Sequence, residues 1–421
     1  MYLSLFILSA LVPLGATAPS RFVKKGQTFS SSTPKPATSF AECQRNTCDD
    51  PLLGCPKGTL YVSQTSSKAD FSSIQAAIES LPNDNSTQYI LIAPGNYTEQ
   101  LNVTRPGPLR LLGVSDRPYL GKSYSDVSSD TDHSNGVTVI WAKSNTDNTG
   151  LSVDNAVTSV LTVAPTYDAS LTGSGPTGFA VPEDTPFGNT DFRAYNIDFR
   201  NVYSEYSSGP ALTVGVSYAN AGFYSCGFYS YQDTVYVGKL GNAYFYDTIV
   251  AGQTDFLYGF GTAWIEESTL ALRGCGGGIT AWKGTNTTFT NKYGVYISNS
   301  HVIAANSSIA PSIKGKCALG RPWNAQHRSI FVDTYLDASI LPAGYIEWSS
   351  TDPRINNYTL MAVYEDYGPG YNISAIEAHS NITTVLNSKT YAPYSSPSKV
   401  FLTEDGVPGD SKWIDSSVFR A

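Results

Sequence analysis

The sequence predicts an all-β fold: a solenoid of stacked β-rich repeats with a short N-terminal capping helix. Similar stretches recur with a period in the low twenties, at residues 224–228, 246–250 and 266–270. The composition agrees, because 28 Tyr, 36 Gly, 24 Pro and only 2 Met suit many short strands and turns. Since each repeat of a solenoid contacts only its neighbours, a chain of this length fits one large domain better than two.

The chain divides into four predicted parts. Residues 1–18 form an apolar run that ends in the small-residue cleavage pattern Ala16-Thr17-Ala18, which is typical of a secretory signal peptide. Residues 19–58 are a Ser/Thr/Pro-rich lead-in with a cysteine cluster, residues 59–405 are the folded domain, and residues 406–421 are a polar C-terminal tail. We therefore expect a secreted, extracellular protein.

The elements of the domain follow from hydrophobic periodicity. Apolar residues at positions 71, 74, 77, 78 and 81 have helical spacing and predict a helix that caps the open end of the solenoid. Residues 89–95 predict a buried strand and a turn, and residues 165–190 predict a long loop. Further strands are expected at 109–112, 137–141, 151–153, 159–163, 192–199, 243–250, 263–272, 294–304, 329–336 and 360–364.

Cysteines and glycosylation sequons support secretion. An even number of cysteines in an oxidising compartment predicts disulfides, and the chain has six: Cys43, Cys48, Cys55, Cys226, Cys275 and Cys317. The first three are clustered, so at least one of them pairs outside the cluster or stays unpaired. Eight Asn-x-Ser/Thr sequons predict a glycoprotein: Asn85, Asn96, Asn102, Asn286, Asn306, Asn357, Asn372 and Asn381.

Charge and motif content exclude several function classes. A net charge of −8 provides no basic footprint for nucleic acid. No apolar run after the signal peptide is long enough to span a bilayer, and the cysteine and histidine spacing fits no zinc site. The chain has no Gly-x-Ser-x-Gly motif, which argues against a serine esterase. We expect a monomer that needs no cofactor or metal and contacts no membrane.

Two aspartates are the main catalytic candidates. Asp233 lies in the stretch Tyr-Gln-Asp-Thr at 231–234, and Asp255 lies in residues 252–259. Because one repeat carries a residue to the same place on the next coil, roughly 4.8 Å away, we expect the two carboxylates to lie side by side. Two close carboxylates have pKa values that split, so their roles can differ. A third stretch, residues 319–323, supplies Arg321 and Trp323.

These motifs resemble those of the pectin methylesterase family. Residues 231–234, 252–259 and 319–323 are similar to its three active-site motifs, and residues 95–99 resemble its Gly-x-Tyr-x-Glu motif. Residues 69–78, 342–348 and 364–370 match further family stretches in the same order, so the resemblance covers nearly the whole domain. It implies a right-handed single-stranded parallel β-helix that hydrolyses the methyl esters of pectin and releases methanol.

The resemblance also implies a role for each residue. The aspartate matching Asp255 is the nucleophile, and the arginine matching Arg321 stabilises its charge. The aspartate matching Asp233 gives a proton to departing methanol and then acts as base for water. The glutamine matching Gln232 donates to the oxyanion. The expected substrate-binding residues are Trp323, Tyr236, Ser208, Gln253, Phe256 and Lys283.

The sequence departs from the family pattern in places that leave alternatives open. Ser208 stands where the family usually has a second oxyanion-hole glutamine, before residues 211–214, and its side chain has a shorter reach. Strand alternation puts Gln253 on the same face as Asp255, where it either supplies the missing donor or has a structural role. Lys283 lies in a stretch where the substrate wall differs from the family. Two alternatives therefore remain: a pectin-binding homologue with little activity, and another β-helix enzyme such as a polysaccharide lyase.

Overall fold

The computed structural model describes residues 40–45, 49–116, 135–146, 153–173, 181–284, 293–403 and 405–419. All of them belong to one compact unit, residues 35–421. The expected signal peptide, the lead-in before residue 40, Cys48 and the sequon at Asn286 lie outside the described residues. The predicted domain boundaries and glycosylation therefore stay predictions.

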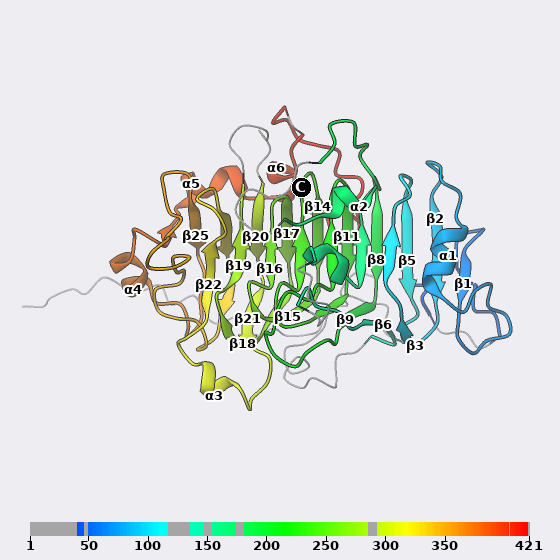
Figure 1. The fold of residues 1–421 in the computed structure, drawn as a ribbon, viewed down its shortest axis with the longest axis horizontal. Coiled ribbons are helices and arrows are strands. Elements are labelled where there is room, and N and C mark those ends of the chain that lie inside the picture. Colours follow the sequence, from blue (N-terminus) through cyan, green and yellow to red (C-terminus); the bar gives the residue numbers. More distant parts are fainter. Residues whose placement is uncertain are drawn as a thin grey trace, which may run out of the picture. The chain divides into compact units, whose positions relative to one another are not determined.

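The strands form three parallel sheets, and each coil from β2 to β22 contributes one strand to each sheet in turn (Figure 1). The 11-stranded sheet has the order β1 (Leu60–Val62), β2 (Gln88–Ile92), β5 (Leu109–Gly113), β8 (Phe192–Tyr195), β11 (Asn220–Tyr224), β14 (Asn242–Tyr246), β17 (Thr262–Glu266), β20 (Gly294–Ser298), β23 (Arg328–Val332), β25 (Leu360–Tyr364) and β26 (Thr384–Val385). The 8-stranded sheet has the order β24 (Tyr335–Leu336), β21 (His301–Ala304), β18 (Thr269–Gly276), β15 (Ile249–Thr254), β12 (Gly227–Tyr229), β9 (Ile197–Asn201), β6 (Val137–Trp141) and β3 (Gly95–Thr98). The 7-stranded sheet has the order β22 (Ala318–Pro322), β19 (Gly278–Trp282), β16 (Leu257–Gly259), β13 (Val235–Val237), β10 (Val214–Val216), β7 (Leu161–Val163) and β4 (Leu101–Val103). This architecture is the predicted right-handed parallel β-helix.

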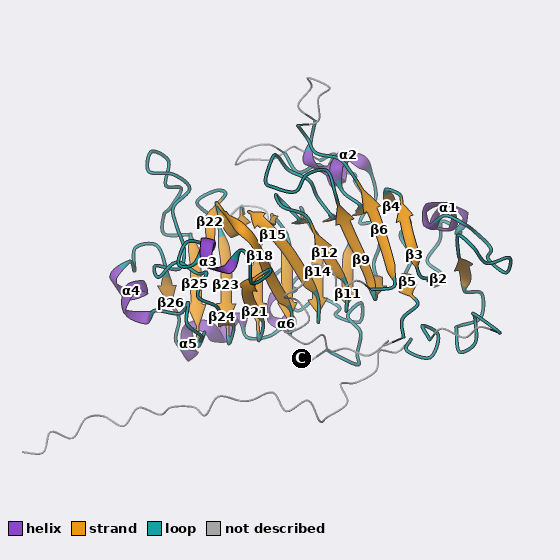
Figure 2. Ribbon diagram, turned by 90° about the horizontal axis from the view of Figure 1, so that it is seen from below, coloured by secondary structure: helices purple, strands orange, loops and turns teal. Residues whose placement is uncertain are grey.

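The helices are short and lie outside the sheets. Among the described residues they are α1 (Ile74–Ser80), α2 (Tyr167–Ser170), α3 (Ala310–Ile313), α4 (Ile373–Ala378), α5 (Ser388–Tyr391) and α6 (Pro397–Val400), with the 3-10 turns η2 (Asn155–Thr158) and η3 (Ala392–Tyr394). Figure 2 shows α1 at one end of the stack of strands and α4 at the other. Among the described residues, no helix is long and apolar enough to cross a membrane.

The predicted capping helix is confirmed as α1. Ile74, Ala77 and Ile78 are buried against the core, and the Ser73 side chain accepts from the Ala76 amide at the N-cap. The carboxylate of Glu99 accepts from the backbone amides of Ile74 and Gln75, at 3.0 and 2.8 Å. These amides have no partner within the helix, so Glu99 helps to hold α1 against the first coils.

Several predicted long strands are in fact two strands joined by a sharp bend. Residues 192–199, 243–250, 263–272, 294–304 and 329–336 are each interrupted by one residue with positive φ: Asn196 (53°), Asp247 (54°), Glu267 (48°), Asn299 (44°) and Asp333 (48°). A single left-handed residue redirects the chain from one sheet into the next. The prediction of unbroken strands is therefore wrong there. In the predicted strand at 151–153, residues 151 and 152 lie outside the described residues and Val153 is not in a strand.

The interior is filled by like residues stacked on successive coils. Phe223 packs on Phe245 with ring centroids 5.0 Å apart, and Phe199 packs on Phe228 at 5.6 Å. Tyr224 is in register with Tyr246, as the predicted repeat requires. Repetition in sequence thus becomes repetition in space, which fixes the register of every coil near the site.

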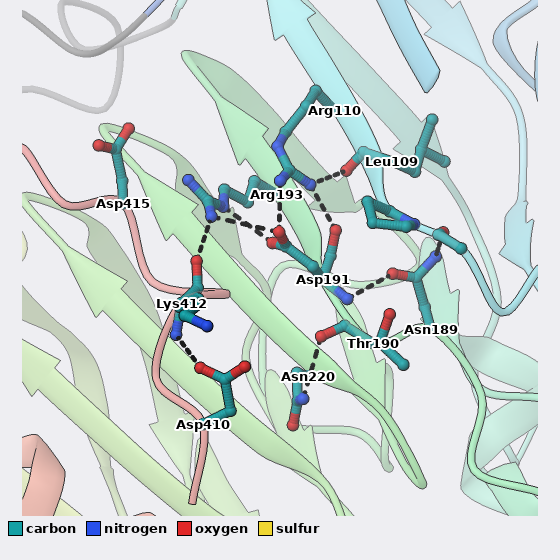
Figure 3. A network of polar contacts seen from close by, with 12 residues as sticks. Leu109, Arg110, Asn189, Thr190, Asp191, Arg193, Asn220, Asp410, Lys412 and Asp415 are labelled. Carbon is teal, nitrogen blue, oxygen red and sulfur yellow. Dashed lines mark hydrogen bonds and ion pairs between the residues drawn. The ribbon is translucent and has the colours of Figure 1, made fainter. Parts of the chain in front are cut away.

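The C-terminal segment 410–419 packs against the 11-stranded sheet. Trp413, Ile414 and Val418 are buried. The Asp415 carboxylate accepts from the Tyr195 hydroxyl at 2.8 Å. In Figure 3, Arg110 and Arg193 both point toward Asp191, and Arg193 also donates to the Lys412 carbonyl oxygen at 2.6 Å. The predicted tail from residue 406 thus includes residues that are part of the packed structure.

The structure contains two disulfides in the described residues, Cys43–Cys55 and Cys275–Cys317. The first pairs two members of the N-terminal cluster with each other, and the third member, Cys48, lies outside the described residues. The second joins the end of β18 to the residue before β22. The Cys226 thiol is buried and lies 3.4 Å from the Ala194 carbonyl oxygen.

Candidate active site

The two aspartates lie at equivalent turns on adjacent coils, as the repeat predicts. Asp233 precedes β13 and Asp255 precedes β16, and these strands pair in register from Val235 and Leu257 onward. Both aspartates have positive φ, 58° and 47°, so each turn aims its side chain out of the regular strand pattern. The Asp233 amide donates to the Thr254 carbonyl oxygen at 3.0 Å, which ties the two turns together.

Asp255 is held by Arg321 from the next coil but one. Arg321 Nε donates to Asp255 Oδ1 and Oδ2 at 3.0 and 3.2 Å, and Nη2 donates to Oδ2 at 2.6 Å. The Gly278 amide donates to Oδ1 at 3.0 Å. Gly277 has a φ of 61°, and a Cβ there would approach Asp255 Oδ1 to 2.5 Å. Glycine is therefore required beside this carboxylate.

The environment separates the two acids. Burial raises the pKa of Asp255, but the hydrogen bonds and charge of Arg321 and the amide of Gly278 oppose that rise. The pKa of Asp233 is raised well above its usual range by burial and then by the charge of Asp255, with only the charge of Arg321 opposing. The pair thus favours an ionised Asp255 beside a protonated Asp233.

Gln232 is oriented by a neighbour that the sequence did not indicate. Ser207 Oγ donates to Gln232 Oε1 at 2.9 Å and lies 2.9 Å from Thr254 Oγ1. With its oxygen engaged, Gln232 keeps its Nε2 group as the donor, which makes no hydrogen bond to the described residues. The Ser207 amide also donates to Gln253 Oε1 at 3.4 Å, so Gln253 is part of the same group.

The Ser208 side chain makes no hydrogen bond to this group. Its Oγ is buried and makes no hydrogen bond within the described part of the chain. It lies in the irregular segment before β10, where strand alternation does not determine which serine faces Gln232. Ser207 is therefore a site residue that the sequence analysis missed by one position.

An aromatic cluster adjoins the acids and is separate from the interior core. Tyr236 packs on Tyr258 with ring centroids 4.9 Å apart, and Tyr258 packs on Trp323 at 5.5 Å. Lys283 Nζ lies 3.6 Å from the ring centroid of Trp323 and donates to the Thr172 carbonyl oxygen at 3.3 Å. Burial lowers the pKa of Lys283 to about 8.

The predicted substrate-binding residues differ in exposure. Trp323 is 8% exposed, whereas Tyr236 and Lys283 are only 2% and 1% exposed. Phe256 is fully buried in the interior core, so it supports the site from beneath and offers no surface to a substrate. Arg321 also stacks on Trp348, with its guanidinium carbon 4.1 Å from the ring centroid.

Asn155 is a second site residue that the sequence analysis missed. Its Nδ2 donates to Asp233 Oδ2 at 3.2 Å and lies 3.4 Å from the Tyr258 hydroxyl. It comes from η2, between two expected strands, and no motif marked it. Among the described residues, no group of three or more His, Cys, Asp or Glu side chains is placed to hold a metal ion.

Comparison with known proteins supports a single family. A model of the Pectinesterase family matches residues 125–404. A probable pectinesterase A from Aspergillus niger is 26% identical over 388 residues, which cover 91% of this chain and 94% of the relative. A putative pectinesterase 11 from Arabidopsis thaliana is 28% identical over 309 residues, covering 72% of this chain and 69% of the relative.

Solved structures agree in fold. The pectin methylesterase from Aspergillus niger matches with a TM-score of 0.61 and 25% identity, over 86% of this chain and 98% of that chain. The pectin methylesterase from carrot matches with a TM-score of 0.64 and 20% identity, over 86% of this chain and 96% of that chain. Since the family model covers more than half of the sequence, the chain belongs to the pectinesterase family of carboxylic ester hydrolases.

Proposed function

We propose that the chain removes methyl esters from pectin outside the cell, with Asp255 as nucleophile and Asp233 as general acid and base. The observation that carries this proposal is the Arg321 fork on Asp255 beside the buried Asp233. The fork favours the ionised form of one acid, whereas burial and a neighbouring negative charge favour the protonated form of the other. Ester hydrolysis by a carboxylate needs this pair of states.

The proposed reaction has two halves. The Asp255 carboxylate attacks the ester carbonyl carbon, and the oxyanion that forms accepts a hydrogen bond from Gln232 Nε2. As the carbon–oxygen bond to the methoxy group breaks, Asp233 gives its proton to that oxygen and methanol leaves. The product is an anhydride between Asp255 and the sugar acid. Asp233 then takes a proton from water, which attacks the anhydride and frees the acid and Asp255.

The proposed substrate is a methyl-esterified pectin chain that passes Trp323 and the neighbouring aromatic cluster. A pectin methylesterase with the same fold has been solved in complex with a hexasaccharide, with a TM-score of 0.58 and 24% identity. This supports an oligosaccharide rather than a small ester as the bound species. We also propose that the protein is a secreted monomer, which the size of the purified extracellular protein would test.

The direct test is methanol release from highly methylated pectin by the purified protein. Asp255→Asn and Asp233→Asn should each abolish methanol release while the melting temperature and circular dichroism spectrum show a folded protein. Near-normal turnover in either folded variant would remove that aspartate from its proposed role. Arg193→Lys, which alters an Arg–Asp pair in the network of Figure 3, serves as the control for a substitution away from the site.

A weakly active pectin-binding protein is the second candidate, and Ser208 favours it. The Ser208 side chain is shorter than the expected second glutamine, and its buried Oγ makes no hydrogen bond to a described residue, so this position is a candidate for a missing oxyanion donor. Loss of one oxyanion donor commonly lowers turnover by about 10²–10³. Pectin binding without methanol release by the wild-type protein would favour this candidate, and an increase in turnover in Ser208→Gln would identify the missing donor as its cause.

A further inference from the structure

We propose that Asn155 is a positioning residue whose side-chain amide determines which oxygen of Asp233 carries the catalytic proton. The inference rests on the proposed role of Asp233 as general acid. It concerns a residue from an earlier coil, far from both aspartate motifs in the sequence. The contact between Asn155 Nδ2 and Asp233 Oδ2, at 3.2 Å, is the starting observation.

The backbone of Asn155 is held on both sides. Asn155 is the first residue of η2, and the Thr158 hydroxyl donates to its carbonyl oxygen at 2.7 Å. The preceding residue, Asp154, caps η2 by accepting from the Ala156 amide at 2.8 Å. Asp154 also accepts from the Thr172 amide at 2.9 Å, which fixes it to the loop after α2. The turn that carries Asn155 is therefore anchored by several short contacts.

The side-chain amide of Asn155 is oriented by Asn145. Asn145 Nδ2 donates to Asn155 Oδ1 at 2.6 Å, so the oxygen of the Asn155 amide faces Asn145. Its Nδ2 group then faces Asp233 Oδ2 and the Tyr258 hydroxyl. Rotating the Asn155 amide by half a turn would bring two N–H groups together at Asn145 and would replace the donor at Asp233 Oδ2 by an acceptor. Asn145 thus fixes Asn155 as a donor toward the acid.

This donor selects one oxygen of the protonated acid. The carbonyl oxygen of a carboxylic acid is a better acceptor than its hydroxyl oxygen, so the N–H group of Asn155 favours Oδ2 as the carbonyl oxygen. The proton then lies on Oδ1, which makes no hydrogen bond to any described residue. An oxygen without a protein partner is the one able to give its proton to a departing methoxy group. Asn155 in this way favours the proton on Oδ1 of Asp233.

The same contact opposes the rise in the pKa of Asp233. Burial and the charge of Asp255 raise the pKa of Asp233, and the charge of Arg321 opposes them. A hydrogen bond from an amide to a carboxylate favours the ionised form, so Asn155 acts in the same direction as Arg321. The titratable and charged groups around Asp233 are Asp255, Arg321 and Tyr258. Asn155 is a neutral member of this group that assists ionisation.

The residues that orient Asn155 are bound to the segment where the expected glutamine is missing. The backbone amide of Asn145 donates to the Pro210 carbonyl oxygen at 3.1 Å, and the Thr146 hydroxyl donates to the Ser208 carbonyl oxygen at 3.3 Å. The segment with Ser208 therefore contributes through its backbone, and Asn155 on another coil adds a side-chain amide beside the acid. Asn155 touches the acid itself, which distinguishes it from a donor to the oxyanion.

The test compares pH profiles of methanol release for purified wild-type, Asn155→Ala and Asn145→Ala proteins. In Asn155→Ala we expect kcat to fall by about 10- to 100-fold with KM nearly unchanged, a part of the usual contribution of a general acid. The alkaline limb of kcat/KM should move to higher pH, because the ionised form of Asp233 has lost a donor. Asn145→Ala keeps Asn155 but removes the contact that orients the Asn155 side-chain amide. We therefore expect smaller changes in kcat and in the alkaline limb, in the same directions.

A buried asparagine elsewhere provides the matched control. Asn189 Nδ2 donates to the Arg105 and Gly107 carbonyl oxygens at 3.0 and 2.7 Å, in the network of Figure 3. Asn189→Ala should lower the melting temperature without moving the pH profile. A shift of the alkaline limb in Asn155→Ala but not in Asn189→Ala supports the proposal. If Asn155→Ala does not fold, the alkaline limb of Asn145→Ala is the deciding measurement: a shift to higher pH supports the proposal, and an unchanged limb contradicts it.

Two failures are distinguishable. If Asp233→Asn is inactive but Asn155→Ala and Asn145→Ala keep the wild-type pH profile, the inference about Asn155 is overturned and the role of Asp233 stands. The inference is also overturned if activity in Asn155→Ala falls only in proportion to the loss of folded protein while the limbs of the pH profile do not move. If Asp233→Asn retains near-normal turnover, the proposed function itself fails, and the inference fails with it.

Discussion

Replacing Arg321 with lysine perturbs the interaction on which the proposed nucleophile depends most. Arg321 presents two nitrogens to the Asp255 carboxylate, with Nη2–Oδ2 at 2.6 Å and Nε–Oδ1 at 3.0 Å. The guanidinium carbon also lies over the ring of Trp348, 4.1 Å from the ring centroid. A lysine ammonium has no planar fork and a different reach, so Arg321→Lys keeps a positive charge but loses this geometry.

The expected loss follows from the number of hydrogen bonds. A hydrogen bond to a charged group contributes about 1.5–3 kcal/mol, and an ammonium replaces at most one of the two nitrogen contacts. The Arg321 side chain is 22% exposed and that of Asp255 is 9% exposed, so solvent screens the pair only in part. A loss of about 1.5–3 kcal/mol in stabilising the reactive carboxylate corresponds to a fall in kcat/KM of about 10- to 150-fold.

The pH dependence has a defined sign. Arg321 lowers the pKa of Asp255 against the effect of burial, and its charge also lowers the pKa of Asp233. Weakening this cation raises the pKa of both acids. The acid limb, where Asp255 must be ionised, and the alkaline limb, where Asp233 must be protonated, should therefore both move to higher pH in Arg321→Lys. Initial rates of methanol release across the pH range measure both limbs.

Arg193→Lys is the matched control. Arg193 makes a similar fork on Asp191, with Nε–Oδ1 at 2.9 Å and Nη2–Oδ2 at 3.2 Å, but it lies on the 11-stranded sheet with the C-terminal segment (Figure 3). It should lower stability without changing kcat/KM of the folded protein. A kcat/KM for Arg321→Lys within about 3-fold of wild type, or limbs that do not move, would refute the role given to the fork.

Three further predictions concern stability and substrate choice. Because burial and Asp255 raise the pKa of Asp233, the folded state binds more protons than the unfolded state above about pH 4, and this destabilises the protein as pH rises. Asp233→Asn should therefore melt higher than wild type at pH 7, with the gain vanishing below about pH 4 in thermal unfolding. The Cys275 disulfide closes 42 residues and the Cys43 disulfide closes 12, so chain entropy predicts that Cys275→Ser costs about 4 kcal/mol and Cys43→Ser about 3 in denaturant titrations; equal losses would contradict this order. The net charge of −8 should favour highly methylated over sparsely methylated pectin, with the difference shrinking in salt that screens over about 10 Å at 0.1 M. A preference for sparsely methylated pectin that salt abolishes would instead indicate binding by local positive charge.

The coils could be predicted from the sequence because their repeat is local. Residues 224–228 and 246–250 carry similar patterns, and the structure pairs Tyr224 with Tyr246. That register is enough to bring Asp233 and Asp255 to equivalent turns on adjacent coils. The helix at α1 was predictable for the same reason, since its apolar spacing and its N-cap serine lie within a few residues of one another.

The remaining features depend on contacts that no local pattern encodes. The bends at Asn196 and Asp247 are single left-handed residues inside runs whose composition is typical of one strand. The contact of Asn155 with Asp233 spans 78 positions, and that of Tyr195 with Asp415 spans 220. Such contacts depend on the number of coils between the two residues and on the lengths of the loops in those coils. Because the loop lengths differ from coil to coil, the regular repeat does not predict these contacts.

The arrangement of charges explains why one arginine is enough for both halves of the proposed reaction. Before the attack, Arg321 is balanced by an ionised Asp255, and Asp233 is neutral. Formation of the anhydride removes the charge of Asp255, and loss of the proton to methanol places a charge on Asp233. The site therefore holds one negative charge and one guanidinium at each stage: the charge is on Asp255 at the start, on the oxyanion in the tetrahedral intermediate, and on Asp233 in the anhydride. Arg321 lowers the pKa of both acids, which is the electrostatic condition for this transfer. A buried site that gained a net charge during the reaction would pay a far larger desolvation cost.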